Sequence, residues 1–164
     1  MQRKRKRNRR RGAYILELSI VLVVFLVTTF GMLDLGSAVF RYHVLSDAAR
    51  QGARRAIVHG QLATVEGVWG PAQIGPVAAT TTGVPIVDGS GPNPNDGIAK
   101  MLVGCDPSKT YITVNWNLNG SSGTTASNTQ GSNVRVTVTS PYTPFMPFLS
   151  GGTLSASSTM QVAH

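Results

Sequence analysis

One carboxylate inside an apolar segment is the residue whose position most demands a chemical explanation. Glu17 is the only charged side chain in the run AYILELSIVLVVFLVTTFGML, which covers residues 13–33. A carboxylate held in lipid costs up to about 3 kcal/mol, so an acidic residue at membrane depth usually has a functional role. Glu17 therefore either pairs with a cation inside the membrane or lies close enough to the membrane edge to reach water.

The length and the flanks of this run predict a membrane-spanning helix. The run would form about 31 Å of helix, which matches the hydrocarbon thickness of a bilayer. Within it, Thr28 and Thr29 are expected to bond back to carbonyls one turn earlier. Eight of the fifteen basic residues of the chain lie between Arg3 and Arg11, and such a cluster holds its end of a helix in the cytoplasm. We expect a single-pass protein with a cytoplasmic amino terminus and an extracytoplasmic remainder.

The same basic cluster accounts for the high net charge. The formal charge is +8, but from Gly12 onward seven basic residues balance seven acidic ones. The net charge therefore describes a short tail and not a basic binding face, and we expect no nucleic-acid partner.

The helical pattern continues beyond the apolar run. No proline interrupts residues 13–59, so we predict one helix about 70 Å long, with a membrane half and an amphipathic half. The alternative is a secretory signal peptide that is cut after Gly36-Ser37-Ala38. Apolar residues of the second half recur every three or four positions and so share one helical face. This face comprises Leu35, Val39, Tyr42, Leu45, Ala49, Ala53 and Ile57.

A strip of small residues follows the second half of the helix. Small side chains permit close approach of another backbone, whether in a sheet or in a helix. We predict a helix-packing site there, either against the protein's own sheet or against another subunit. Its residues are Ala48, Ala49, Gly52, Ala53 and Ala56.

Residues 60–109 contain six prolines, which exclude long helices. We expect an irregular region there, with a short extended piece at Val84–Val87 and a brief helix around Asp96–Val103. Residues 110–164 alternate apolar and polar side chains, which is typical of strands with one buried face. The predicted strands are Thr110–Leu118, Val134–Thr139 and Leu154–Val162.

The expected fold class is therefore α+β. A small antiparallel sheet would lay its apolar face against the Leu35–Ile57 face of the long amino-terminal helix. In chain order, the regions are a basic leader (1–12), the helix (13–59), the irregular region (60–109) and the β region (110–164).

No residues in the sequence form a recognisable active site. His43, His59 and His164 lack the spacing of metal ligands, and no nucleophile elbow or phosphate-binding motif is present. We therefore expect no enzymatic activity, no cofactor and no metal. Cys105 has no second cysteine in the sequence with which to pair.

A different class of function rests on two tryptophans and on the Thr/Asn-rich strands of the outer region. Trp69 and Trp116 could serve a secreted or membrane-anchored β domain that binds a small ligand or a carbohydrate. The mature amino terminus distinguishes these classes, because a signal peptide would leave Val39 as the first residue.

The junction between the leader and the helix resembles the processing site of type IV pilin-like proteins. The residues that carry this resemblance are Arg10, Arg11, Gly12, Ala13 and Glu17. The resemblance implies that a prepilin peptidase cuts between Gly12 and Ala13 on the cytoplasmic side. It also implies that Glu17 pairs with the terminal amine of a neighbouring subunit.

The stretch from Gly31 to Gly60 is similar to the TadE family of tight-adherence pilus assembly proteins, and so is the ending from Val134 to Val162. Asp34 stands where glutamate is frequent in that family. The resemblance implies a pilin-like fold and a role as a minor pilin or pseudopilin in assembly of a type IVc, Flp-type pilus. Its partners would be other pilin-like subunits and the assembly platform of the bacterial inner membrane. The motif block is Ala48-Ala49-Arg50-Gln51-Gly52-Ala53-Arg54.

Overall fold

The computed structural model describes residues 4–63, 67–71, 73–90, 97–117, 127–146 and 150–163. The chain forms two compact units, and a single helix runs through both. The first unit comprises Met1–Ser37 with Pro144–Ser150, and the second comprises Ala38–Thr143 with Gly151–His164.

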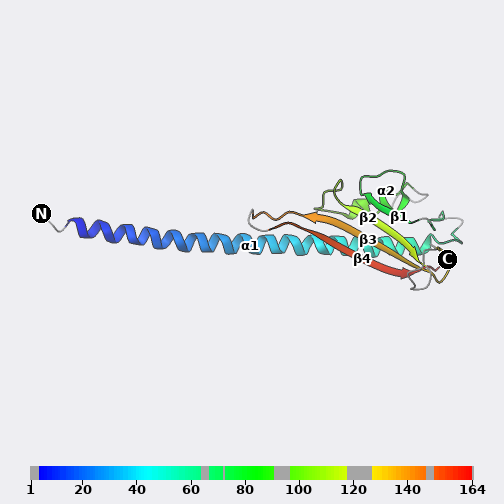
Figure 1. Ribbon diagram of the computed structural model, residues 1–164, viewed down its shortest axis with the longest axis horizontal. Helices are drawn as coiled ribbons and strands as arrows, with labels where there is room; N and C mark the ends of the chain where they lie inside the picture. The colour runs from blue at the N-terminus through cyan, green and yellow to red at the C-terminus, as the bar shows by residue number, and fades with distance from the viewer. Residues whose placement is uncertain are drawn as a thin grey trace. The chain divides into compact units, whose positions relative to one another are not determined.

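The predicted long helix is present as α1, which spans Lys4–Val58 (Figure 1). Its apolar part carries three hydroxyl side chains that donate to carbonyls one turn earlier. Thr28 donates to the Val24 carbonyl at 2.6 Å, and Thr29 donates to the Phe25 carbonyl at 2.8 Å. Ser19 donates to the Ile15 carbonyl at 2.7 Å. These bonds satisfy the hydroxyl groups within the helix itself, and they confirm the expectation for the two threonines.

The sheet has four antiparallel strands in the order β1-β2-β3-β4. The three predicted strands are confirmed as β2 (Tyr111–Asn117), β3 (Asn133–Tyr142) and β4 (Gly152–Gln161). The sequence did not predict β1 (Ile74–Ala78), because the segment contains Gly75 and Pro76. Proline is tolerated in β1 because the strand lies at an edge of the sheet, and its pairing with β2 is irregular between Ile74 and Val77.

The described part of the connection between β1 and β2 holds two short helical segments. The extended piece expected at Val84–Val87 is wrong, because α2 spans Pro85–Asp88 and only Val84 before it is extended. Proline is preorganised for the first turn of a helix, where its missing N–H costs nothing. The brief helix expected around residues 96–103 appears as the 3-10 turn η1, Ala99–Met101.

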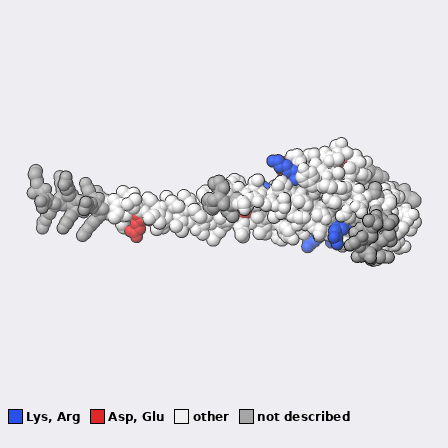
Figure 2. Space-filling view, in the orientation of Figure 1, with Lys and Arg blue, Asp and Glu red and all other residues white. Residues whose placement is uncertain are grey.

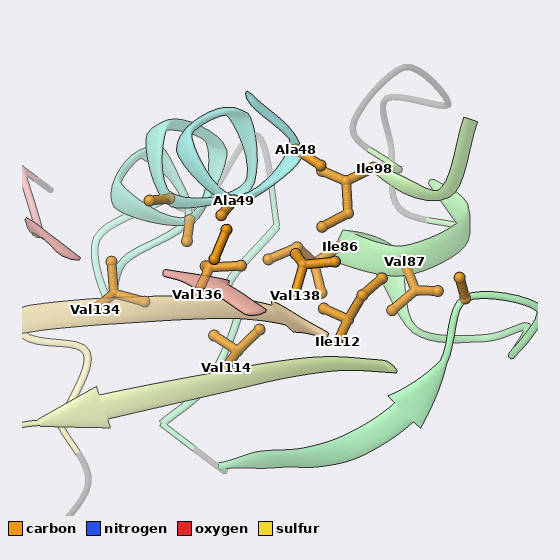
Figure 3. Close-up of a cluster of buried hydrophobic side chains, with 14 of the residues drawn as sticks. Ala48, Ala49, Ile86, Val87, Ile98, Ile112, Val114, Val134, Val136 and Val138 are labelled. Carbon is orange, nitrogen blue, oxygen red and sulfur yellow. The ribbon is translucent and has the colours of Figure 1, made fainter. Parts of the chain in front are cut away.

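The core of the second unit lies between the sheet and α1, as the expected fold class requires. Strand residues of alternate positions face the helix, and β2 and β3 pair them in register, for example Val114 with Val136. Figure 3 shows the valines of β3 pointing toward the helix that carries Ala48 and Ala49. All the central members are fully buried: Leu45, Ala48, Ala49, Ala53, Ala56, Ile112, Val114, Trp116, Val134, Val136 and Val138.

The buried face of the helix is shorter than the predicted Leu35–Ile57 face. Leu35, Val39 and Tyr42 are 70%, 48% and 49% exposed, whereas Leu45 is fully buried. The Arg41 guanidinium lies 5.4 Å from the centroid of the Tyr142 ring, and Tyr142 is the last residue of β3. The apolar pattern of the sequence thus begins before the buried face of the helix does.

Candidate functional site

The start of the apolar helix is accessible on all the sides that the structure describes. Glu17 is exposed, and so are Ile15, Leu16 and Leu18, at 64%, 68% and 63%. Figure 2 shows acidic atoms in an otherwise uncharged stretch of this helix. Within the described part of the chain, no hydrogen bond or ion pair to the Glu17 carboxylate is present. The carboxylate therefore points outward from α1 among apolar side chains.

The predicted processing residues lie one turn earlier on the same helix. Gly12 and Ala13 are both exposed. A Cβ atom built on Gly12 would meet nothing within 4 Å, and glycine inside a helix costs about 1 kcal/mol relative to alanine. Packing within the described residues therefore gives no reason for a glycine at this position.

The helix from Gly12 to Val58 is long and apolar enough to cross a membrane, and none of its most apolar window is buried. It is the one such helix among the residues that the structure describes. This conclusion rests on the length and the composition of the helix, which fit a membrane anchor or a signal sequence equally well. What distinguishes the segment is its exposure, since a core helix of a water-soluble domain would be covered.

The predicted small-residue strip lies under the protein's own sheet. Its four alanines have no exposed surface. A Cβ built on Gly52 would lie 3.1 Å from Val136 Cγ1 and 3.3 Å from Ile98 Cδ1. Glycine at this position therefore lets α1 approach β3 and the segment before η1 more closely than any other residue would.

A second acidic residue of the helix has a different environment from Glu17. Asp34 is only 4% exposed. Its Oδ1 accepts the backbone N–H of Phe145 at 2.7 Å, and its Oδ2 accepts that of Met146 at 3.0 Å. The sequence showed an acid just beyond an apolar run, but nothing in it pointed to donors 111 residues away.

The histidine that could have suggested catalysis has a structural role. The His59 ring stacks on Trp69 with centroids 3.8 Å apart and an interplanar angle of 5°. Its Nδ1 is hydrogen-bonded to the Gly67 carbonyl at 2.7 Å. Across the described residues, no group of three His, Cys, Asp or Glu side chains could hold a metal ion.

The two tryptophans do not offer a surface for stacking a sugar ring. Trp69 is 7% exposed and Trp116 is fully buried. The Trp116 ring lies against Gly70, where an added Cβ would be 2.8 Å from the indole. Both indoles are therefore part of the core, so the tryptophans do not support a carbohydrate-binding surface.

Comparison with known families gives a direct match to the amino-terminal part of the chain. Residues 12–54 match the family model of TadE-like proteins. The chain carries a TadE-like domain. No curated protein and no solved structure matches the chain. The match begins at the glycine where the basic leader ends, and it stops at Arg54 in the small-residue block, so it covers the part of α1 that holds Glu17, Asp34 and Gly52.

Proposed function

We propose that this protein is a membrane-anchored minor pilin or pseudopilin that takes part in assembling a tight-adherence pilus of the type IVc, Flp kind. The observation that carries the proposal is the start of the TadE-like match at Gly12, where the basic leader gives way to an exposed apolar helix. TadE-like proteins are generally structural and not enzymes, so the protein would act through helix packing and subunit contacts.

Processing by a prepilin peptidase between Gly12 and Ala13 is the first step of this function. The exposure of both residues supports it, because a peptidase must reach the bond. The absence of any atom within 4 Å of a Cβ on Gly12 also supports it, since the glycine then has no packing role among the described residues.

Cleavage would give the helix a free amine at Ala13, four residues before Glu17. In a low-dielectric surrounding, opposite charges attract far more strongly than in water, and each relieves the cost of burying the other. The outward-facing carboxylate of Glu17 is available for the amine of a neighbouring subunit. Pairing of this kind would draw a new subunit into register before it leaves the membrane.

In this function the basic leader faces the cytoplasm, and the second unit lies outside the inner membrane of a bacterium. The clustered charges between Arg3 and Arg11 support this orientation by the positive-inside rule. The partners would be the prepilin peptidase, other pilin-like subunits and the assembly platform. The protein would act at the base of the pilus or within the fibre.

The decisive experiment is to determine the mature amino terminus by mass spectrometry of protein purified from its native host. An Ala13 terminus, with or without methylation, supports the proposal. A Val39 terminus would indicate signal peptidase and a released product, and an intact Met1 would leave a plain anchor; either outcome overturns the proposal.

A pair of glycine variants makes this experiment specific. Gly12→Val should block processing and leave Met1 in place. Gly36→Val is a matched control, because Gly36 is also exposed on α1 and also has nothing within 4 Å of an added Cβ. It should leave processing unchanged.

A further inference from the structure

The turn after β3 is held against the end of the apolar helix by one side chain. The Asp34 carboxylate accepts the consecutive backbone N–H groups of Phe145 and Met146 at 2.7 Å and 3.0 Å. Charge-assisted bonds of this length are roughly twice as strong as bonds between neutral groups. All three residues belong to the first unit, so these bonds tie the turn to the helix within that unit.

The Asp34 carboxylate and the two backbone N–H groups satisfy each other at a position that would have little water if α1 spans a bilayer. A carboxylate near lipid is costly unless it is paired, and backbone that is not helical is tolerated at membrane depth only where its polar groups are satisfied. Here the carboxylate is satisfied by the turn, and the two N–H groups are satisfied by the carboxylate. The arrangement makes an acid and a turn compatible with an apolar surrounding in which neither would be stable alone.

The position of Asp34 along α1 sets the depth of this turn. Asp34 lies 21 residues after Ala13, which corresponds to about 32 Å of helix, and the hydrocarbon layer of a bilayer is about 30 Å thick. Met32, Leu33 and Leu35 around Asp34 are 71%, 61% and 70% exposed. Apolar side chains thus surround the helix at the level where it would leave the hydrocarbon.

Phe145 is presented outward from the turn. It is 85% exposed, although its neighbour Met146 is 6% exposed. An aromatic ring left in water at this level would lose the stabilisation of about 2 kcal/mol that burial of such a side chain provides. The turn therefore has the features of an interfacial anchor, namely an apolar tip on a fixed and internally satisfied backbone.

We propose that the turn Pro144–Met146, held by Asp34, is a second membrane contact that seats the Phe145 ring in the outer lipid interface. This rests on the proposed function, because it requires α1 to span the bilayer. The contact would fix the chain at two points of the interface, the helix and the turn, and so would limit rotation of the exit end of the helix relative to the membrane surface.

The test places a nitroxide label at position 145 of the full chain, as Phe145→Cys in a Cys105→Ala background. The chain is inserted in vesicles of phosphatidylethanolamine and phosphatidylglycerol. Two reference labels are used, Val24→Cys in the apolar run and Ser157→Cys on the exposed side of β4. Collisions with oxygen, which concentrates in lipid, are compared with collisions with a water-soluble nickel chelate.

The label at 145 should favour oxygen over nickel, as the label at 24 does, whereas the label at 157 should show the inverse ratio. Asp34→Asn is nearly isosteric but offers one acceptor oxygen and an amide donor in place of two acceptors. It should increase nickel collisions at 145 without changing the readings at 24 and 157, because the turn is released while the helix stays inserted.

Three outcomes would overturn the inference in distinguishable ways. Nickel access at 145 with lipid access at 24 would leave the membrane anchor standing and refute the lipid contact of the turn. Nickel access at 24 as well would refute the anchor and the proposed function with it. Shielding from both reagents, with dipolar broadening that disappears on dilution with unlabelled chain, would place a second copy on Phe145 instead of lipid.

Discussion

Replacing Gly52 by alanine should destabilise the second unit of the natural chain, yet stabilise it once Val136 has been shortened. The added Cβ would lie 3.1 Å from Val136 Cγ1 and 3.3 Å from Ile98 Cδ1, closer than carbon atoms normally approach. Alanine in place of glycine favours a helix by about 1 kcal/mol. Forcing a methyl group into a well-packed core costs about 2 kcal/mol, so we expect a net loss of about 1 kcal/mol.

Shortening the facing side chain removes the main obstacle. Val136→Ala alone deletes two buried carbons and should cost about 2–3 kcal/mol from lost transfer energy and the cavity. In that background the Cβ of Gly52→Ala enters the space left by Val136 Cγ1, so the helix propensity dominates. The second substitution should then stabilise the unit by about 1 kcal/mol, which gives a coupling energy of about 2 kcal/mol.

Urea denaturation of the full chain in detergent micelles can measure all four members of this cycle. The fluorescence of Trp69 and Trp116, which are both buried and both in the second unit, reports unfolding of that unit. The control is the neighbouring exposed residue Gln51, because the difference between Gln51→Ala and Gln51→Gly measures the helix propensity alone. If Gly52→Ala stabilises both backgrounds by that same amount, α1 does not approach β3 as closely as we describe, and the reasoning fails.

Three further predictions concern single side chains. Glu17→Gln keeps the size of the side chain but removes its charge. It should strongly reduce the number of pili counted by electron microscopy in the native host, and a normal number of pili would contradict the pairing role of Glu17. His59→Ala removes the stack on Trp69 and a partly buried hydrogen bond, and should lower the urea-derived free energy of unfolding by about 1–3 kcal/mol. An unchanged value would mean that the stack contributes nothing. Thr110→Val deprives the buried Ser140 hydroxyl of its partner at 2.9 Å and should cost about 1–3 kcal/mol. Adding Ser140→Ala should recover part of that loss, and an equal loss in both variants would rule out the pair as its source.

Features with a local physical cause could be predicted from the sequence. The long helix follows from an uninterrupted run that is first apolar and then amphipathic, because hydrophobic periodicity can be read from residues that are close together in the sequence. The strands β2, β3 and β4 follow from alternation of apolar and polar residues for the same reason. The antiparallel sheet on the helix then follows from the need to bury both apolar faces together.

Features that depend on distant contacts could not be predicted. The edge strand β1 has a composition that disfavours strands, and only its pairing with β2 orders it. The buried helix face begins at Leu45 and not at Leu35, because burial depends on packing partners that the apolar pattern of the helix does not identify. Two tryptophans that looked available for a ligand are core residues, since their burial depends on segments far away in the chain.

Glu17 and Asp34, both on α1, show where this boundary lies. The sequence alone determined that Glu17 is a carboxylate in an apolar run beside a basic leader, because the charges and the run are contiguous. Only the tertiary structure decided the role of Asp34, because its two donors lie 111 and 112 residues away in the chain. A hydrogen bond between such distant residues exists only after β3 has brought the turn beside the helix, and no local pattern of residues encodes that approach.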